Sequence, residues 1–125
     1  MQCATREELT LEPSRHAPAQ ARRAVHDFAT AVAPSSARTA ELLASELVTN
    51  AVTHGRGEVR VLMEYDGRGL AVAVSDEDPA TPQVSAARTT SLGGRGLRLV
   101  EVLASDWGVE PDRRGPGKCV WFRLG

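Results

Sequence analysis

The chain has 125 residues, of which 42% are hydrophobic and 25% are charged, and its formal net charge is −1. This length and composition fit one domain with a substantial hydrophobic core. The small net charge argues against general binding to nucleic acid or to anionic membranes, and the 4% aromatic content argues against stacking on single-stranded bases. We expect no membrane span, no signal peptide and no disulfide framework, and therefore a cytoplasmic protein.

The first part of the chain is predicted to be a flexible N-terminus over residues 1–7, followed by a single domain over residues 8–125. Residues 8–11 favour a short strand. Between residues 18 and 32, apolar side chains recur three and four positions apart, which is typical of an amphipathic helix. Pro18 suits the first turn of that helix.

A second helix is predicted over residues 36–54. The segment Pro34-Ser35-Ser36 offers a hydroxyl cap for it, and Gly55, in a left-handed conformation, is expected to end it. Its apolar residues fall on one broad arc. Glu46 and Asn50 are four residues apart, so they lie on one stripe of the helix beside that arc. A carboxylate and an amide at the border of a buried face need partners, such as a cation and the groups it bridges. The alternative is that both are merely solvated, because polar pairs at this spacing are common.

Two hairpins, separated by a loop and a third helix, are predicted for the rest of the chain. The first hairpin turns at Asp66–Gly69, which is a strong hairpin signal between alternating apolar residues. The predicted elements are strands at 58–65 and 70–75, a loop at 80–92, a helix at 95–104, and strands at 106–111 and 118–124. Paired antiparallel strands with helices between the pairs favour an α+β two-layer sandwich with helices on one sheet face. A doubly wound dinucleotide-binding fold is not favoured, because it needs strict alternation of strands and helices.

An acidic cluster, made of Asp76, Glu77 and Asp78, follows the first hairpin and ends at Pro79. A carboxylate at the end of a strand can accept a hydrogen bond from an exocyclic amine, which is how the edge of a purine is read. The cluster is therefore a candidate base-binding site. The alternative is a solvated turn, since aspartate and proline are common turn residues.

A glycine-rich segment, Gly93-Gly94-Arg95-Gly96, stands immediately before the third predicted helix. Glycine N–H groups at a helix N-terminus can bind an anion, and the guanidinium of Arg95 adds a fork suited to phosphate. The segment matches neither the P-loop pattern nor the Gly-x-Gly-x-x-Gly pattern. The alternative is a hinge without a ligand, because glycine-rich turns often only connect elements.

Five segments carry a resemblance to a known family when they are taken together. They are Glu46–His54, Asp76–Pro79, Gly93–Leu97, Trp107–Gly108 and Lys118–Phe122. This combination resembles the histidine-kinase-like ATPase family, and more closely its small anti-sigma-factor serine/threonine kinases of actinobacteria. The resemblance covers nearly the whole chain. It implies a Bergerat ATP-binding fold, in which a mixed, mostly antiparallel sheet has helices on one side and ATP lies between the helices and a lid.

The resemblance also implies a role for individual residues. Asn50 matches the asparagine that ligates Mg²⁺, and Glu46 matches the acid proposed as general base toward a substrate hydroxyl. Asp76 matches the aspartate that reads adenine. The glycines that wrap the phosphates match Gly93, Gly94 and Gly96, and we expect Arg95 and Leu97 to belong to the same ATP-binding segment.

The function implied by the resemblance is that of an ATP-dependent protein serine/threonine kinase with Mg²⁺ as cofactor. Such a protein would phosphorylate an antagonist protein, sequester a sigma factor and form a homodimer, without binding nucleic acid or membrane directly. A non-catalytic ATP-binding module, acting as a nucleotide-dependent switch, is the alternative. Two departures from the family pattern are the absence of glycine directly after Asp76 and the presence of Cys119 where relatives often carry threonine.

Overall fold

The structure, a computed structural model, describes residues 5–79 and 92–125, with side chains described for 5–79 and 97–125. Within these ranges the chain forms one five-stranded sheet with the order β1-β2-β3-β5-β4. The strands are β1 (Thr5–Leu11), β2 (Val59–Tyr65), β3 (Leu70–Asp76), β4 (Asp106–Pro111) and β5 (Lys118–Leu124). The α-helices are α1 (Ala17–Val32), α2 (Ala37–His54) and α3 (Leu92–Leu103), and a 3₁₀ turn, η1 (Pro34–Ser36), precedes α2.

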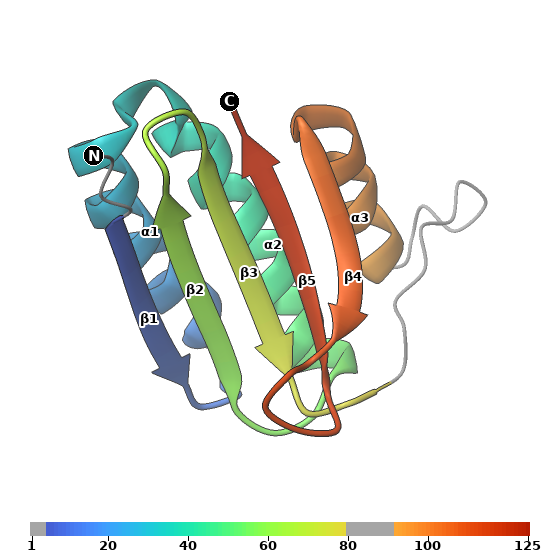
Figure 1. The fold of residues 1–125 in the computed structure, drawn as a ribbon. Coiled ribbons are helices and arrows are strands. Elements are labelled where there is room, and N and C mark those ends of the chain that lie inside the picture. The colour runs from blue at the N-terminus through green and yellow to red at the C-terminus, as the bar shows by residue number, and fades with distance from the viewer. Residues whose placement is uncertain (1–4, 80–91) are drawn as a thin grey trace.

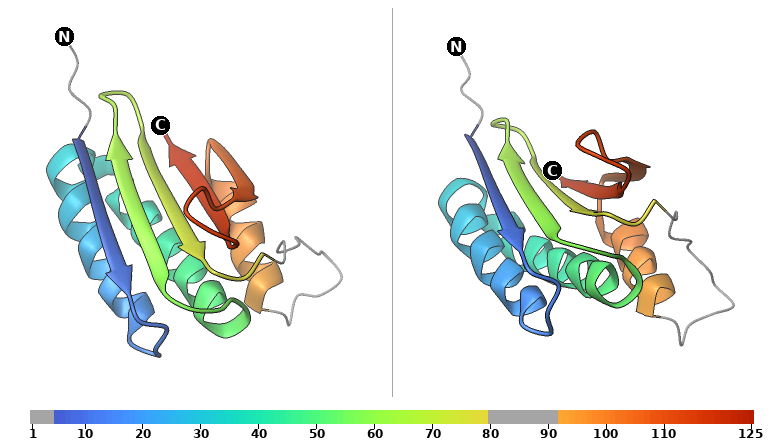
Figure 2. Two further views of the ribbon diagram at one scale, coloured as in Figure 1. Left: turned by 60° about the horizontal axis from the view of Figure 1, so that its bottom comes forward. Right: turned by 90° about the horizontal axis from the view of Figure 1, so that it is seen from below.

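All four strand pairings in the described sheet are antiparallel. The three helices lie on one face of the sheet, and the other face carries no helix of the described chain (Figures 1 and 2). The α+β two-layer sandwich predicted from the sequence is therefore confirmed. No helix in the described ranges is long and apolar enough to cross a membrane.

The core lies between the helices and the sheet, because every second strand residue points toward the helices. On β3 the buried residues are Leu70, Val72, Val74 and Asp76, and on β5 they are Lys118, Val120, Phe122 and Leu124. Two charged residues therefore occupy positions on the buried face, at the end of β3 and the start of β5. The register pairs Asp76 directly with Lys118.

The second helix has nearly its predicted bounds, but the geometry at both of its ends differs from the prediction. Ser36 adopts φ −99° and ψ −5° as the last residue of η1, and its hydroxyl makes no capping hydrogen bond within the described chain. A side-chain cap needs an extended backbone at this position, which the 3₁₀ turn does not provide. Gly55 ends α2 with an extended backbone, φ −91° and ψ −159°, and not with the expected left-handed conformation.

The predicted boundaries of two other elements also shift. The third helix begins at Leu92, so Gly93–Gly96 form part of the helix instead of a turn before it. The first strand begins at Thr5, three residues before the predicted start. Its seven residues pair with β2 from Thr5 to Leu11, which a short apolar pattern did not indicate. The predicted loop at 80–92 lies outside the described residues, apart from Leu92.

Candidate functional site

The candidate site lies at the end of the molecule where α2 and β3 finish and where β5 and α3 begin. Figure 1 shows these four ends at the same edge of the sandwich, on the helix side of the sheet. The antiparallel pairing of β3 with β5 brings Asp76 beside Lys118, although the two residues are 42 positions apart in the sequence. Three segments of the predicted site, on α2, β3 and α3, therefore reach one edge of the fold.

Asp76 is a buried carboxylate at this edge, with 3% of its surface exposed. Its Oδ1 atom accepts hydrogen bonds from the backbone N–H of Asp78 at 2.7 Å and from Nζ of Lys118 at 3.0 Å. Lys118 also donates to the backbone carbonyl of Asp78 at 3.1 Å. The alternative of a solvated turn does not apply to Asp76, which points into the fold.

The approach of α2 to Asp76 depends on the absence of a side chain at Gly55. A Cβ atom at Gly55 would lie 2.6 Å from Cγ and 2.7 Å from Oδ2 of Asp76. A Cβ atom at Gly117, just before β5, would lie only 1.7 Å from the backbone carbonyl oxygen of Asp76. Gly55 therefore lets α2 approach the carboxylate of Asp76, and Gly117 lets the start of β5 approach its backbone.

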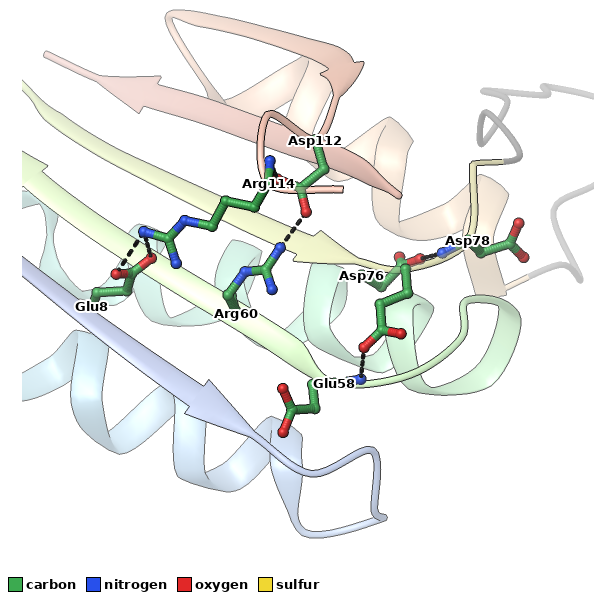
Figure 3. Close-up of polar contacts among 8 residues, drawn as sticks. Glu8, Glu58, Arg60, Asp76, Asp78, Asp112 and Arg114 are labelled. Atoms are coloured by element: carbon green, nitrogen blue, oxygen red, sulfur yellow. Dashed lines mark hydrogen bonds and ion pairs between the residues drawn. The ribbon is translucent and has the colours of Figure 1, made fainter. Parts of the chain in front are cut away.

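The rest of the acidic cluster is tied to the turn that follows α2. The N–H of Glu77 donates to the carbonyl of Arg56 at 2.7 Å, and its Oε2 accepts from the N–H of Glu58 at 3.0 Å. Gly57, with φ +72°, leaves space for the Glu77 carboxylate. Figure 3 shows Asp76 and Asp78 at the end of β3, beside Glu58 at the start of β2. These contacts fix the backbone on which Asp76 is placed.

Asn50 and Glu46 lie on α2, about one turn apart. Both residues are half-buried, as their position beside the apolar arc predicts. Oδ1 of Asn50 is buried and has no hydrogen-bond partner among the described residues. A buried amide oxygen without a partner is costly, and a hard cation such as Mg²⁺ would supply the missing interaction. The residue therefore fits the proposed metal.

The helix α3 contains the predicted phosphate-binding residues, and its backbone alone is described from Leu92 to Gly96. The first four N–H groups of a helix have no partner within it, so those of Leu92, Gly93, Gly94 and Arg95 are free of intrahelical bonds. An anion could therefore still bind there, although the glycines lie inside the helix. Leu97 is fully buried in the core, where it anchors the first turns of α3.

The sequence patterns gave Lys118 no role in the predicted site, although this residue begins one of the segments that carry the family resemblance. The side chain is 9% exposed and points to the helix side of β5, although it is charged. A lysine at an inward position of a strand, in phase with Val120, Phe122 and Leu124, is a signal that alternation alone could have found. Buried lysines are rare unless they are paired, so this position indicates a buried carboxylate nearby.

A cavity of about 450 Å³ lies elsewhere, on the sheet face that carries no helix. Its lining includes Arg60, Ser75, Cys119 and Trp121, but none of Glu46, Asn50 or Asp76. The turn between β4 and β5 folds over it, because Asp112 accepts a hydrogen bond from Arg60 and Arg114 pairs with Glu8 (Figure 3). This hollow is therefore separate from the site predicted on the helix side.

Three described groups with a shifted pKa, those of Cys119, Asp66 and Arg114, lie away from the predicted site residues. Burial raises the pKa of the Cys119 thiol on the helix-free face. Hydrogen bonds from Gly69 and Arg68 lower the pKa of Asp66 in the β2–β3 turn, and Arg123 adds to this effect. The Arg114 pKa is raised by its hydrogen bond to Glu8. Cys119 is half-buried.

The chain matches a known protein family and is similar to solved structures. The family model described as the histidine kinase-like ATPase domain matches residues 10–124. The solved structure of the RsbU and RsbW domains of Rv1364c from Mycobacterium tuberculosis is similar to the chain, with a TM-score of 0.71 and 19% sequence identity. The match covers 96% of this chain and 32% of that one, so the chain spans about a third of its length. At this identity the likeness shows the fold alone. A search among curated proteins gave no match.

Proposed function

The chain belongs to the histidine kinase-like ATPase domain family, and from that premise we propose that it binds ATP with Mg²⁺ and acts as an anti-sigma-factor-type protein serine/threonine kinase. In this proposal it phosphorylates a serine of an antagonist protein and sequesters a sigma factor, as a homodimer. The similar solved structure includes an RsbW domain, which supports this choice within the family.

The observation that carries the proposal is the buried Oδ1 of Asn50 on α2, which has no hydrogen-bond partner in the described part of the chain. Magnesium takes oxygen ligands in octahedral geometry and keeps several waters, so it is usually held by few protein groups together with substrate phosphates. One amide oxygen is a sufficient protein contribution to such a site. No group of three or more His, Cys, Asp or Glu side chains that could hold a metal exists in the described chain, which agrees with a metal held mainly by phosphates and water.

The two ends of the nucleotide are assigned to different elements. Asp76 would accept a hydrogen bond from the amine of the base, because its carboxylate lies at the end of β3 beside the last turn of α2. The N–H groups of Gly93, Gly94 and Arg95 at the start of α3 would bind the phosphates, where the helix dipole favours negative charge. Arg95 and Gly96 would complete that segment.

The proposed reaction is the transfer of the γ-phosphoryl group from ATP to a serine hydroxyl. The serine oxygen forms a bond to phosphorus, the bond to the leaving ADP breaks, and Glu46 takes the hydroxyl proton. Phosphoryl transfer depends mainly on positioning and charge neutralisation, so a single carboxylate on a rigid helix is adequate for the proton. A switch without catalysis would need Asn50 and Asp76 but not Glu46.

The test combines calorimetric titration of ATP·Mg²⁺ with transfer of labelled phosphate to a candidate antagonist protein. We expect Asn50→Ala to lower ATP affinity by roughly tenfold or more in the presence of Mg²⁺, because it removes a ligand to the metal. We expect Glu46→Gln to leave ATP affinity nearly unchanged and to lower the transfer rate by roughly 10²- to 10⁴-fold, which is typical for loss of a general base.

The matched control is Glu41→Gln, which makes the same chemical change on the same helix. Glu41 pairs with His26 of α1 at 2.7 Å, away from the predicted site. Its substitution should alter neither ATP binding nor transfer. ATP binding without any transfer would favour the non-catalytic switch, and absence of ATP binding by the wild-type protein would disprove both functions.

A further inference from the structure

The ion pair between Asp76 and Lys118 is the least expected feature of the proposed nucleotide site. The two residues are direct partners across β3 and β5, and Nζ of Lys118 lies 3.0 Å from Oδ2 of Asp76. Their exposed fractions are 9% for Lys118 and 3% for Asp76. Removing two charges from water is costly, and only their close pairing compensates for that cost. The carboxylate assigned to the base is therefore accompanied by a cation.

The hydrogen bonds of this pair leave capacity on both sides. Within the described residues, Nζ of Lys118 donates hydrogen bonds to Oδ1 of Asp76 and to the carbonyl of Asp78. An ammonium group has three N–H donors, so one remains for another acceptor. Oδ2 of Asp76 makes the ion-pair contact and packs against Gly55, and a carboxylate oxygen with one such contact retains a further lone pair. The carboxylate of Asp76, as acceptor, and the ammonium of Lys118, as donor, therefore lie side by side.

Purines differ in the groups that they present at positions 6 and 1. A 6-amino purine presents an amine donor at position 6, whereas a 6-oxo purine presents a carbonyl acceptor there and an N–H donor at position 1. A carboxylate alone would accept from the amine of a 6-amino purine but would repel the carbonyl of a 6-oxo purine. With the ammonium of Lys118 beside Asp76, the carbonyl has a donor and the ring N–H still has an acceptor.

We propose that Lys118 is a specificity-determining residue that makes this base site accept 6-oxo as well as 6-amino purine nucleoside triphosphates. The inference rests on the proposed nucleotide site and adds the class of nucleotide that it takes. Its basis is the buried Asp76–Lys118 pair at the position assigned to the base. The cation removes the repulsion by which an unaccompanied carboxylate would exclude a carbonyl oxygen.

The test compares the dissociation constants of ATP and inosine triphosphate, which differ only in the base positions at issue. Calorimetric titration with Mg²⁺ is expected to give wild-type values within roughly threefold of one another, because each base finds one donor and one acceptor. Lys118→Met keeps the length of the side chain without the donor. It is expected to raise the ratio of the inosine to the adenosine constant by roughly tenfold or more, because the carbonyl then faces only a carboxylate.

Lys118→Gln is the matched control, because its amide retains an N–H donor without the charge. Its ratio is expected to stay near the wild-type value if donation to the carbonyl is what matters. Melting temperatures identify any variant that fails to fold, and Lys118→Leu, which also lacks a donor, replaces Lys118→Met if that variant does not fold. The wild-type ratio is informative by itself, since rejection of inosine triphosphate by more than about tenfold would overturn the inference.

Two further results would also overturn it. If Lys118→Met weakens both nucleotides by the same factor, the lysine supports the fold without reading the base. If the ratio does not change at all, Lys118 has no role in specificity. Absence of binding of either nucleotide to the wild-type protein is a different result, because it would remove the proposed nucleotide site itself and the inference with it.

Discussion

Gly55 has no side chain at the position where one would collide with the carboxylate of Asp76. A Cβ there would lie 2.6 Å from Cγ of Asp76 and 2.5 Å from the carbonyl oxygen of Ala51. Its backbone is extended, so the glycine is needed for space and not for a left-handed turn. The last turn of α2 and the end of β3 can therefore approach each other only with glycine at this position.

We predict that Gly55→Ala lowers the free energy of unfolding by roughly 1–3 kcal/mol, because neither the Ala51 carbonyl nor the Asp76 carboxylate can move without losing its contacts. Denaturation in urea measures the change. Gly115→Ala is the control, because a Cβ at Gly115 would meet no atom within 4 Å. That variant should be neutral or more stable by up to about 1 kcal/mol. Equal stability of the two variants would contradict the assigned role of Gly55.

Individual residues of the site were predictable only in part. Asn50 and Glu46 were visible as a polar pair at the edge of an apolar arc, because helix geometry relates residues four apart. Asp76 was visible as an acid at the end of a strand. The partner of Asp76 was not visible, because Lys118 follows in the chain after a further helix and strand, and only the sheet register brings the two together.

The β2–β3 hairpin is the element whose turn chemistry the sequence predicted most directly. Oδ1 of Asp66 accepts hydrogen bonds from the N–H groups of Arg68 and Gly69, both at 2.9 Å. Oδ2 of the same carboxylate pairs with Arg123 of β5 at 2.8 Å. These contacts favour the ionised carboxylate, so the pKa of Asp66 lies well below its usual range. The turn thus links β2, β3 and β5 through one side chain.

This low pKa predicts a specific response of stability to acid. A folded-state pKa below the unfolded one means that the unfolded chain binds more protons. The contribution of Asp66 is therefore complete above the unfolded pKa of about 3.9 and is lost as the pH falls from there toward the folded pKa. We expect Asp66→Asn to show a smaller loss of melting temperature than wild type between about pH 4 and pH 2.

Asp27→Asn provides the comparison for Asp66→Asn, since it makes the same substitution at an exposed position on α1. Its acid dependence should follow that of the wild-type protein over this pH range. Thermal melts in matched ionic strength measure all three proteins. An acid response of Asp66→Asn identical to that of wild type would show that the turn carboxylate does not contribute.

Elements differed in how well their ends could be predicted. The strands β4 and β5 were predicted at their observed bounds, because alternation and the glycine-rich turn between them are local signals. The start of α3 was predicted three residues late, since glycines disfavour a helix locally. In the folded chain α3 packs on α2, and Leu97 and Val100 are fully buried, so tertiary packing stabilises a helix that local preference does not.

At the scale of the whole molecule, α2 is the central helix, because it contacts α1, α3, β2 and β3. Two adjacent leucines on this helix have opposite environments. Leu43 is fully buried between the helices and the sheet, whereas 44% of the Leu42 surface is exposed. Comparing substitutions at Leu42 and Leu43 therefore separates the contribution of the core to stability from the general effect of removing a leucine from a helix.

We predict that Leu43→Ala lowers the free energy of unfolding by about 2–5 kcal/mol, because it leaves a cavity at the centre of the core. Leu42→Ala should change it by less than about 1 kcal/mol, as expected for an exposed helix position. Chemical denaturation of both variants gives the comparison. A cost for Leu42→Ala as large as that for Leu43→Ala would mean that the exposed face of α2 is also buried, for example against a second copy of the chain.

The sequence by itself determined the order of elements and the two-layer α+β fold, because helix period, strand alternation and turn chemistry all act over a few neighbouring residues. The residues proposed for ATP came from the resemblance of five sequence segments to a known family. Tertiary structure alone decided how Asp76 is surrounded. Lys118 pairs with it across β3 and β5, and Gly55 approaches it from α2. Both contacts depend on strand register and on helix packing, which join distant parts of the chain and leave no pattern in a local stretch of sequence.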